Sequence, residues 1–162
     1  MALALTFRNR QKRRGVELRS LRRLTRVLLA DLLQVREADL GVFLVAAPEM
    51  TQLNETFLQH AGSTDVITFD YAEQETPQAR QALHGEIFIC VDEAVIQARR
   101  FRGSWQAEVV RYVVHGVLHL LGYDDVRAAD RRRMKREEDR LCAELAARFA
   151  LSRLAGKPRL RA

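Results

Sequence analysis

The segment from Val109 to Leu121 constrains the fold most, because its side chains are apolar almost all the way around a helix. Such a helix belongs in the interior of a domain. His115 and His119 nevertheless interrupt it four residues apart, so they lie on one face, one turn from each other. Burying two imidazoles is unfavourable unless their nitrogens find partners. A divalent metal ion shared by the two rings would satisfy both.

Two residues after this helix supply the rest of the candidate site. Gly122 is well placed to end the helix in a left-handed turn, so that Asp125 can offer a carboxylate from the far side. Three protein ligands leave the fourth tetrahedral position for water, as in a catalytic rather than a structural zinc site. We therefore predict that His115, His119 and Asp125 hold one Zn²⁺ per chain. The alternative is that the histidines are ordinary helix residues and that Asp125, or Asp124 beside it, caps the next helix.

The rest of the chain alternates strand patterns with amphipathic helix patterns. Strands are expected at 2–8, 40–46, 65–71 and 86–91, with a polar loop at 72–83. Helices are expected at about 18–35, 48–57, 92–101, 104–121 and 127–149, with Asp92 and Ser104 as caps for the third and fourth. The pattern predicts an α+β fold in which about five helices pack a roughly four-stranded mixed sheet, with the metal site on a buried central helix.

Length and composition fit one globular domain, expected at 1–152, followed by a loose basic tail at 153–162. Hydrophobic residues make up 48% and charged residues 30%, which excludes a disordered chain. No apolar run approaches the roughly 18 residues that span a bilayer, and the N-terminus is a poor signal peptide. Cys90 and Cys142 are too few for a disulfide scaffold. We therefore expect a cytoplasmic protein with no membrane partner.

The net charge of +6 and a pI of about 10.0 favour an anionic partner. Bases gather at 8–14, 127–140 and 153–161, although acidic residues partly neutralise the second cluster. Nucleic acid is one such partner, but basic composition alone does not distinguish it from others.

The metal-site segment also resembles a known family. Residues 115–124 read His-Gly-Val-Leu-His-Leu-Leu-Gly-Tyr-Asp, similar to the signature of the YbeY family of bacterial ribosomal-RNA maturation factors. Leu53-Asn54 with Phe57, the segment 63–69 and the segment 85–87 are similar to further parts of that family, and the order of elements matches from about residue 2 to 150. The resemblance implies a zinc-dependent endoribonuclease whose metal is held by three histidines.

Two positions depart from the family pattern. Asp125 stands where the family has its third histidine, and Leu58 stands where the family has an arginine thought to help catalysis. A carboxylate can complete a zinc site, but it lowers the net charge of the metal and its ligands. Leucine cannot replace a bidentate phosphate clamp. Arg111, one turn before His115, is a candidate substitute; alternatively it only solvates the start of the helix.

The resemblance favours a single-strand-specific endoribonuclease that matures the 3′ end of small-subunit (16S) rRNA and aids ribosome quality control. His115, His119 and Asp125 would act through the metal and its water, with Arg111 assisting. Arg10, Arg13 and Arg14, again with Arg111, are the RNA-binding candidates for single-stranded or precursor rRNA. The small ribosomal subunit and its assembly factors are the expected partners.

Two other functions compete with this hypothesis. A metalloprotease would carry a glutamate general base directly after the first histidine, where this chain has Gly116, so we discount it. A non-catalytic ribosome-assembly factor that binds RNA and protein around a structural metal is the serious alternative, because function depends on the site rather than the fold.

Overall fold

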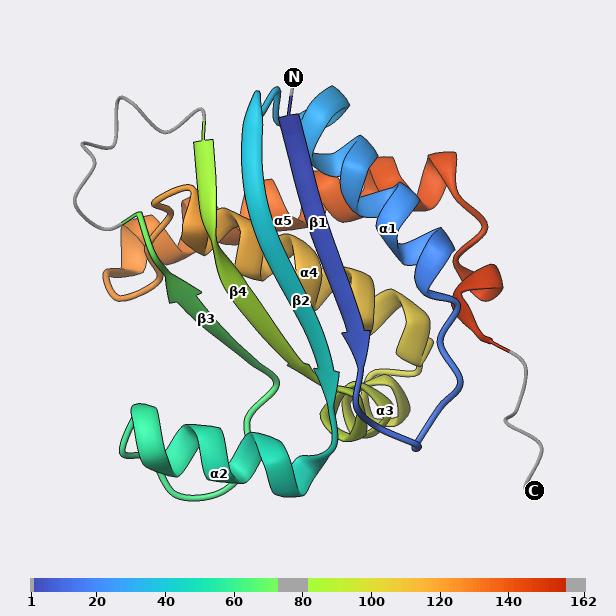
Figure 1. Ribbon diagram of the computed structural model, residues 1–162, viewed down its shortest axis with the longest axis vertical. Coiled ribbons are helices and arrows are strands. Elements are labelled where there is room, and N and C mark those ends of the chain that lie inside the picture. The colour runs from blue at the N-terminus through green and yellow to red at the C-terminus, as the bar shows by residue number, and fades with distance from the viewer. Residues whose placement is uncertain (1, 73–81, 157–162) are drawn as a thin grey trace.

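A four-stranded mixed sheet forms the centre of the computed structural model, which describes residues 2–72 and 82–156 (Figure 1). The strand order is β1-β2-β4-β3. Three strands run parallel: β1 (Ala2–Asn9), β2 (Glu37–Val45) and β4 (Ala82–Cys90). The edge strand β3 (Val66–Asp70) is antiparallel to β4.

Helices cover the two faces of the sheet unequally. On one face lie α1 (Leu18–Val27) with the π-helical turn η1 (Leu28–Leu32), α4 (Trp105–Leu120) and α5 (Ala128–Arg148). α2 (Ala47–Phe57) packs on the other face, and α3 (Val91–Arg100) directly follows β4. A short 3₁₀ turn, η3 (Leu151–Leu154), follows α5. This arrangement confirms the predicted α+β fold.

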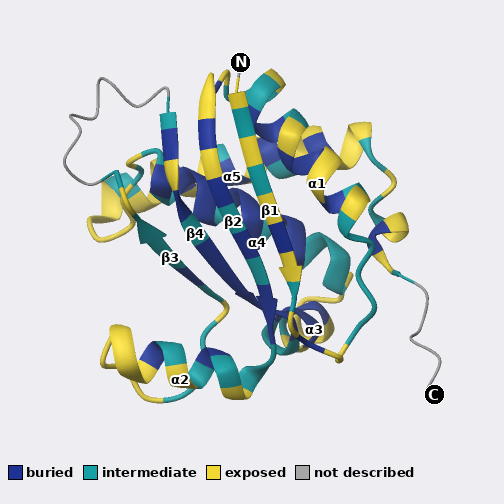
Figure 2. Cartoon of the chain, in the orientation of Figure 1, coloured by how far each residue is buried: buried dark blue, intermediate teal, exposed yellow. Residues whose placement is uncertain are grey.

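The central helix α4 lies between the sheet and α5, and most of its residues are buried (Figure 2). Gly116 explains how close the helix comes to the sheet, because a Cβ there would lie 2.8 Å from two carbon atoms of Ile87 on β4. Ser104 begins the helix as expected, with its hydroxyl accepting a hydrogen bond from the amide of Ala107 at 3.1 Å. The position of α4, which carries both histidines, is thereby fixed against the sheet.

Several expected boundaries differ from the structure, two of them by more than three residues. The helix expected at 18–35 passes into a π turn, in which the amide of Leu33 bonds the carbonyl of Leu28, and it stops before Gln34 at φ 54°. β4 begins at Ala82 rather than at 86, because it pairs with β2 along the whole strand. The expected loop at 72–83 otherwise lies mostly outside the described residues.

Asp92 does not cap the helix that it was expected to cap. Cys90 is the N-cap of α3, and Asp92 sits in the first turn of that helix. Its carboxylate instead accepts a hydrogen bond of 2.6 Å from the amide of Ala47, the first residue of α2. The residue therefore ties the start of one helix to the start of another, a contact that sequence distance conceals.

The chain after α5 is packed at least as far as residue 156. Leu154 is buried, and Ala155 forms an isolated antiparallel bridge with Val16. The backbone amides of Gly156 and Glu17 donate to the carbonyls of Gly15 and Leu154, respectively, each at 2.8 Å. Of the expected tail, residues 153–156 thus belong to the domain, and 157–162 lie outside the described residues. Among the helices of the described chain, none has the length and apolar character needed to cross a membrane.

Candidate metal centre

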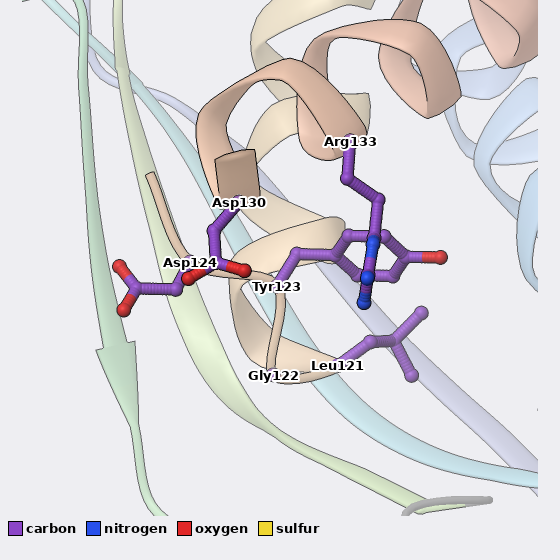
Figure 3. Close-up of a pocket in the computed structure, with 6 residues that line it drawn as sticks. All are labelled: Leu121, Gly122, Tyr123, Asp124, Asp130 and Arg133. Carbon is purple, nitrogen blue, oxygen red and sulfur yellow. The ribbon is translucent and has the colours of Figure 1, made fainter. Parts of the chain in front are cut away.

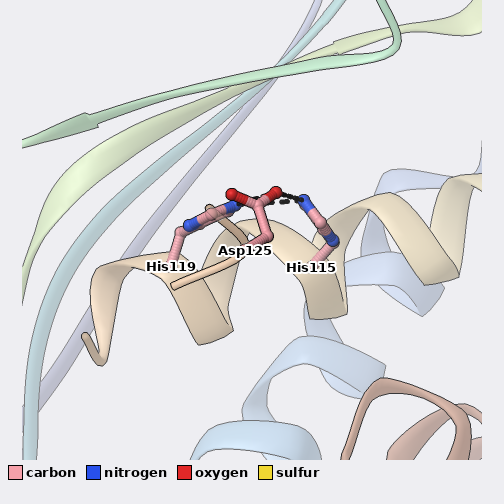
Figure 4. Close-up of side chains that lie close together, drawn as sticks. All are labelled: His115, His119 and Asp125. Atoms are coloured by element: carbon pink, nitrogen blue, oxygen red, sulfur yellow. Dashed lines mark hydrogen bonds and ion pairs between the residues drawn. The ribbon is translucent and has the colours of Figure 1, made fainter. Parts of the chain in front are cut away.

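The structure brings the three predicted ligands together (Figure 4). The Nε2 atoms of His115 and His119 lie 3.1 Å apart. Oδ2 of Asp125 lies 3.4 Å from Nε2 of His119 and 4.0 Å from Nε2 of His115. Tetrahedral zinc bonds of about 2.0–2.1 Å place ligand atoms about 3.3 Å from each other. The donor set and its spacing therefore fit a small divalent cation.

The turn after α4 directs Asp125 back over the histidines. Gly122 has φ 99°, a conformation that glycine adopts without strain. Its amide donates to the carbonyl of His119, and the amide of Tyr123 donates to the carbonyl of Leu118, each at 3.0 Å. This pair of bonds is the Schellman motif. The predicted left-handed turn is confirmed.

The site is accessible although the helix is buried. The side chains of His115 and His119 are 27% and 26% exposed, and that of Asp125 is 45% exposed. The two imidazoles lie on the stripe of α4 that emerges beside β3 (Figure 4). Three ligands with access to solvent leave room for a further ligand from solution, as catalytic sites require.

A second carboxylate, that of Glu138 on α5, fixes the orientation of His115. Its Oε1 lies 2.8 Å from Nδ1 of His115, and only 8% of the side chain is exposed. A carboxylate can only accept, so Nδ1 carries the proton and the lone pair of Nε2 faces His119 and Asp125. Hydrogen bonds of this kind set the tautomer and ring orientation of metal-binding histidines.

Charges around Glu138 keep it ionised despite its burial. Burial alone would raise its pKa, but hydrogen bonds from His115 and Arg111 lower the pKa of Glu138 to about 2. For His115, burial opposes the positive charge. The hydrogen bond and negative charge of Glu138, with Asp65 and Asp125 nearby, nevertheless raise the pKa of His115 in the metal-free protein.

Arg111 lies behind the site rather than over it. One of its guanidinium nitrogens, Nη1, is 2.7 Å from Oε2 of Glu138 and 2.7 Å from Oδ1 of Asp139. Lys135 adds a weaker contact of 3.4 Å to Glu138. The structure therefore places Arg111 as the anchor of the carboxylate that orients His115, with both of its acidic partners on α5.

The sequence contains a signal for Glu138 that the pattern analysis missed. Met134, Leu141 and Leu145 are buried on one stripe of α5, and Glu138 occupies the same stripe. A glutamate at a core position of an amphipathic helix indicates a buried cationic or hydrogen-bonding partner. Which partner it meets depends on how α5 packs on α4.

The other candidate residues are not gathered at the metal centre. Arg10 pairs with Glu49 at 3.0 Å, Arg13 pairs with Asp92 at 3.7 Å, and Arg14 donates to the carbonyl of Arg13. The two ion pairs fasten the loop after β1 to the starts of α2 and α3, whereas the contact of Arg14 lies within the loop.

Leu58, at the position where the family has an arginine, follows the end of α2 and is 44% exposed. Cys90 and Cys142 are both free thiols.

A shallow pocket opens at the turn between α4 and α5 (Figure 3). Its lining combines backbone and apolar surface with charged side chains, contributed by Leu121, Gly122, Tyr123, Asp124, Asp130 and Arg133. The metal ligands do not line this pocket, but the same turn carries Asp125. The carboxylate of Asp124 accepts from the amide of Val126 at 3.0 Å, so Asp124 shapes the turn instead of joining the ligands.

Fold and site together define an α+β protein with a candidate mononuclear metal centre on a core helix. The family model described as Endoribonuclease YbeY matches residues 6–146. Endoribonuclease YbeY of Syntrophotalea carbinolica is 34% identical over 143 residues, which cover 87% of this chain and 95% of that protein. The chain belongs to the YbeY family.

Further comparisons agree on the fold. Endoribonuclease YbeY of Chlorobium phaeovibrioides is 40% identical over 91 residues, and the match spans 56% of this chain and 57% of that protein. The solution structure of TM1509 from Thermotoga maritima has a TM-score of 0.66 and 23% identity. It covers 97% of this chain and 99% of that one, a likeness that concerns the fold alone.

Proposed function

We propose that this protein is a metal-dependent endoribonuclease that cleaves single-stranded RNA during the maturation of ribosomal RNA. The observation that carries the proposal is the cluster of three ligand atoms, with separations of 3.1, 3.4 and 4.0 Å. Membership of the YbeY family and relatives named Endoribonuclease YbeY support RNA as the substrate. The proposed metal is zinc, one ion per chain, because imidazole and carboxylate ligands at tetrahedral spacing suit it.

The residues of the site divide the work between holding the metal and holding its ligands. His115, His119 and Asp125 bind the ion, while Glu138 and Arg111 keep His115 turned toward it. A divalent ion held by these residues would supply Lewis acidity, which polarises a phosphoryl oxygen and makes a water molecule a better nucleophile. Gly116 is incapable of proton transfer, so the residue after the first histidine takes no part in acid–base chemistry.

We further propose that the physiological substrate is the precursor at the 3′ end of small-subunit rRNA, in the cytoplasm and in contact with the small ribosomal subunit and its assembly factors. The competing proposal is an assembly factor that binds RNA without cutting it. It draws support from Leu58 and Asp125, the two positions at which the chain departs from the family pattern. The two proposals agree on RNA binding and differ on cleavage.

An RNA-cleavage assay distinguishes the nuclease proposal from the assembly-factor proposal. It compares a 20-nucleotide single-stranded RNA with the same sequence in a duplex. The full chain is stripped with a chelator, reloaded with zinc and assayed by gel. We expect cleavage of the single strand by wild type, and its loss in His119→Ala and Asp125→Asn. The matched control is Asp124→Asn, which changes the neighbouring carboxylate on the same turn and should retain activity.

Further experiments test the two positions at which the chain departs from the family pattern, and then the RNA substrate. Leu58→Arg and Asp125→His, alone and together, should cleave at least as well as wild type, since each restores the family residue. A transcript that spans the 3′ end of the small-subunit precursor should be cut at a defined position. If wild type and these three variants all bind zinc but none cuts above the metal-stripped control, the nuclease proposal is wrong and the assembly-factor proposal replaces it.

A further inference from the structure

The outer surface of α1 carries an unusual concentration of positive charge. All the charged residues of this helix are arginines, and all are exposed: Arg19, Arg22, Arg23 and Arg26. No ion pair joins any of them to another residue in the described part of the chain, although the guanidinium of Arg22 lies 5.7 Å from the ring centre of Phe7. Some arginines elsewhere in the described chain, namely Arg10, Arg13, Arg111 and Arg140, do have acidic partners.

This arrangement costs helix stability. The four arginines are three or four residues apart along one side of the helix, and like charges at those spacings repel each other by a few tenths of a kcal/mol per pair. No acidic residue within α1 offsets the repulsion. A solvated helix face is ordinarily built from both signs of charge, so four arginines without an acid indicate an anionic partner.

The C-terminal end of the domain adds two more arginines to this face. A pocket of about 250 Å³ is lined by Arg23 of α1, Arg148 at the end of α5 and Arg153 of η3, over an apolar floor that includes Leu24 and Phe149. Arg148 makes one exposed ion pair, with Glu144 at 3.6 Å, and Arg153 pairs with no described residue. The backbone bonds between 15–17 and 154–156 hold η3 beside α1, so the presence of three arginines around one pocket is built into the fold.

The arginine pocket is separated from the metal centre along α5. Glu138, which contacts the candidate ligand His115, lies in the middle of α5, and Arg148 is the last residue of that helix. The ten residues from Glu138 to Arg148 span about 15 Å of helix. At the spacing of about 3.4 Å per nucleotide in a stacked strand, that distance corresponds to roughly four nucleotides. A phosphate group held at the pocket therefore belongs to a part of the strand several nucleotides away from the metal.

We propose that Arg23, Arg148 and Arg153 form a second anchor for single-stranded RNA, which holds backbone phosphates about 15 Å along α5 from the metal centre. Arginine suits this role, since its planar guanidinium can donate two parallel hydrogen bonds to one phosphate. The proposal rests on the proposed RNA substrate and extends it, because it makes binding depend on the length of the RNA. The exposed arginines of α1 continue the same surface.

Binding of labelled oligouridines to the full chain tests the anchor, by fluorescence anisotropy with a chelator present so that nothing is cut. The test variant carries Arg23→Gln, Arg148→Gln and Arg153→Gln. The control removes the same charge from the exposed end of α3, through Arg99→Gln, Arg100→Gln and Arg102→Gln. A third variant replaces Arg23, Arg148 and Arg153 by lysine, which keeps the charge and shows that substitution there leaves the fold intact.

For a 20-nucleotide RNA, we expect the glutamine variant to bind about tenfold more weakly than wild type at moderate salt. Its plot of log affinity against log salt should also be shallower by about 2, or 0.7 for each of three lost phosphate contacts. The lysine variant should keep the wild-type slope, the α3 control should stay within about twofold of wild type, and a dinucleotide, too short to reach both sites, should not distinguish the variants. Equal losses in the α3 control, or none in the test variant, would overturn the anchor.

The outcome is separable from that of the proposed function. Length-dependent binding through these arginines by a protein that cuts no RNA leaves the anchor standing and removes the nuclease. Cleavage that survives with full affinity in the glutamine variant leaves the nuclease standing and removes the anchor.

Discussion

At the scale of single residues, the candidate metal centre depends on how its first imidazole is held. Nδ1 of His115 meets a carboxylate 2.8 Å away, and that carboxylate meets a guanidinium 2.7 Å away. This series of contacts runs from Arg111 on α4 through Glu138 on α5 to His115 on α4. It links the two helices through a carboxylate that is largely buried. Its consequence is that in the neutral imidazole of His115 the Nε2 atom, which faces the other two candidate ligands, is the one left without a proton.

Replacement of Glu138 should therefore weaken metal binding without removing a ligand. We expect Glu138→Ala to lower zinc affinity about 10–100-fold, and Glu138→Gln to lower it less, because the amide oxygen can still accept from Nδ1. Glu137→Ala is the matched control, since this neighbouring glutamate pairs with Arg140 instead. Competition with a chromophoric chelator gives the affinities. Nitrogen NMR of the metal-free protein should show the Nδ1–H form of His115 in wild type, and zinc affinity in Glu138→Ala equal to that of the control would refute the role.

Asp125 should tolerate exchange for the family residue and for little else. Asp125→His retains a competent ligand on the same turn, so about one zinc ion per chain should remain bound. Asp125→Ala removes the third ligand, and zinc should then be lost on dialysis against a weak chelator. The metal content of the two variants checks this. Zinc retained by Asp125→Ala would show that Asp125 is not a ligand.

The sequence predicts the candidate ligand cluster because its residues are local: the two histidines, Gly122 and Asp125 fall within 11 residues, and helix periodicity with one turn motif brings them together. It does not identify Glu138 as the partner of His115, since that contact depends on the rotation of α5 about its own axis. The position of Arg111 was likewise predictable only to within a helix turn. The pairing of Arg111 with two acidic residues, Glu138 and Asp139, depends on how α5 packs against α4.

At the scale of elements, the close approach of α4 to β4 is the feature that places the site. Gly116→Ala would put a methyl group 2.8 Å from Cδ1 and Cγ2 of Ile87. We expect a net loss of about 1–2 kcal/mol in the free energy of unfolding, after the gain in helix propensity. Urea unfolding measures it. Gly103→Ala is the control, because its Cβ meets nothing within 4 Å.

The same contact predicts coupling between the two positions. Ile87→Ala alone should cost about 2–5 kcal/mol because it opens a cavity. Combined with Gly116→Ala it should cost less than the sum of the two single changes, since the new methyl group fills part of that cavity. Strictly additive free energies would contradict the packing described.

The start of α1 provides a prediction that depends on pH. The Glu17 carboxylate accepts from the amides of Ser20 at 2.6 Å and Arg19 at 3.3 Å, and the hydrogen bond to Ser20 lowers the pKa of Glu17 below its ordinary 4.5. Its stabilising effect is therefore present above pH 4.5 and is lost as the pH falls through the lower folded-state pKa.

Glu17→Ala should accordingly lower the free energy of unfolding by about 1 kcal/mol at pH 7. The difference from wild type should become smaller as the pH falls through the pKa of Glu17 in the folded state. Thermal unfolding at several pH values measures this, with Glu37→Ala as a control because Glu37 is exposed and has no capping contact. A cost that is unchanged at pH 3 would mean that the carboxylate charge does not contribute.

Element types were more predictable than their ends. Ser104 and Pro48 mark helix starts that the structure confirms, because their effect is local. The π turn at 28–32 and the role of Asp92 at α2 were not predictable, since both reflect contacts between distant segments. β4 likewise extends to match β2, which no periodicity within β4 specifies.

At the scale of the whole molecule, the order β1-β2-β4-β3 places the last strand between the second and third. Sequence patterns indicate how many strands there are but not this order, because pairing between distant strands leaves no local trace. The grouping of charged residues on the surface likewise depends on the fold and is not visible in the sequence. The basic clusters of the sequence include Arg10 and Arg13, which are engaged by acids, whereas the face of α1 gains Arg148 and Arg153 only through the fold.

Metal content, measured together with RNA cleavage, tests the central claim that His115, His119 and Asp125 hold the ion on which activity depends. Wild type and His119→Ala are purified without added metal, checked for folding, and divided between elemental analysis and assay on single-stranded RNA. The account predicts about one divalent ion per chain and cleavage in wild type, with both lost in His119→Ala. Equal metal content in the two proteins, or equal cleavage by them, would contradict it.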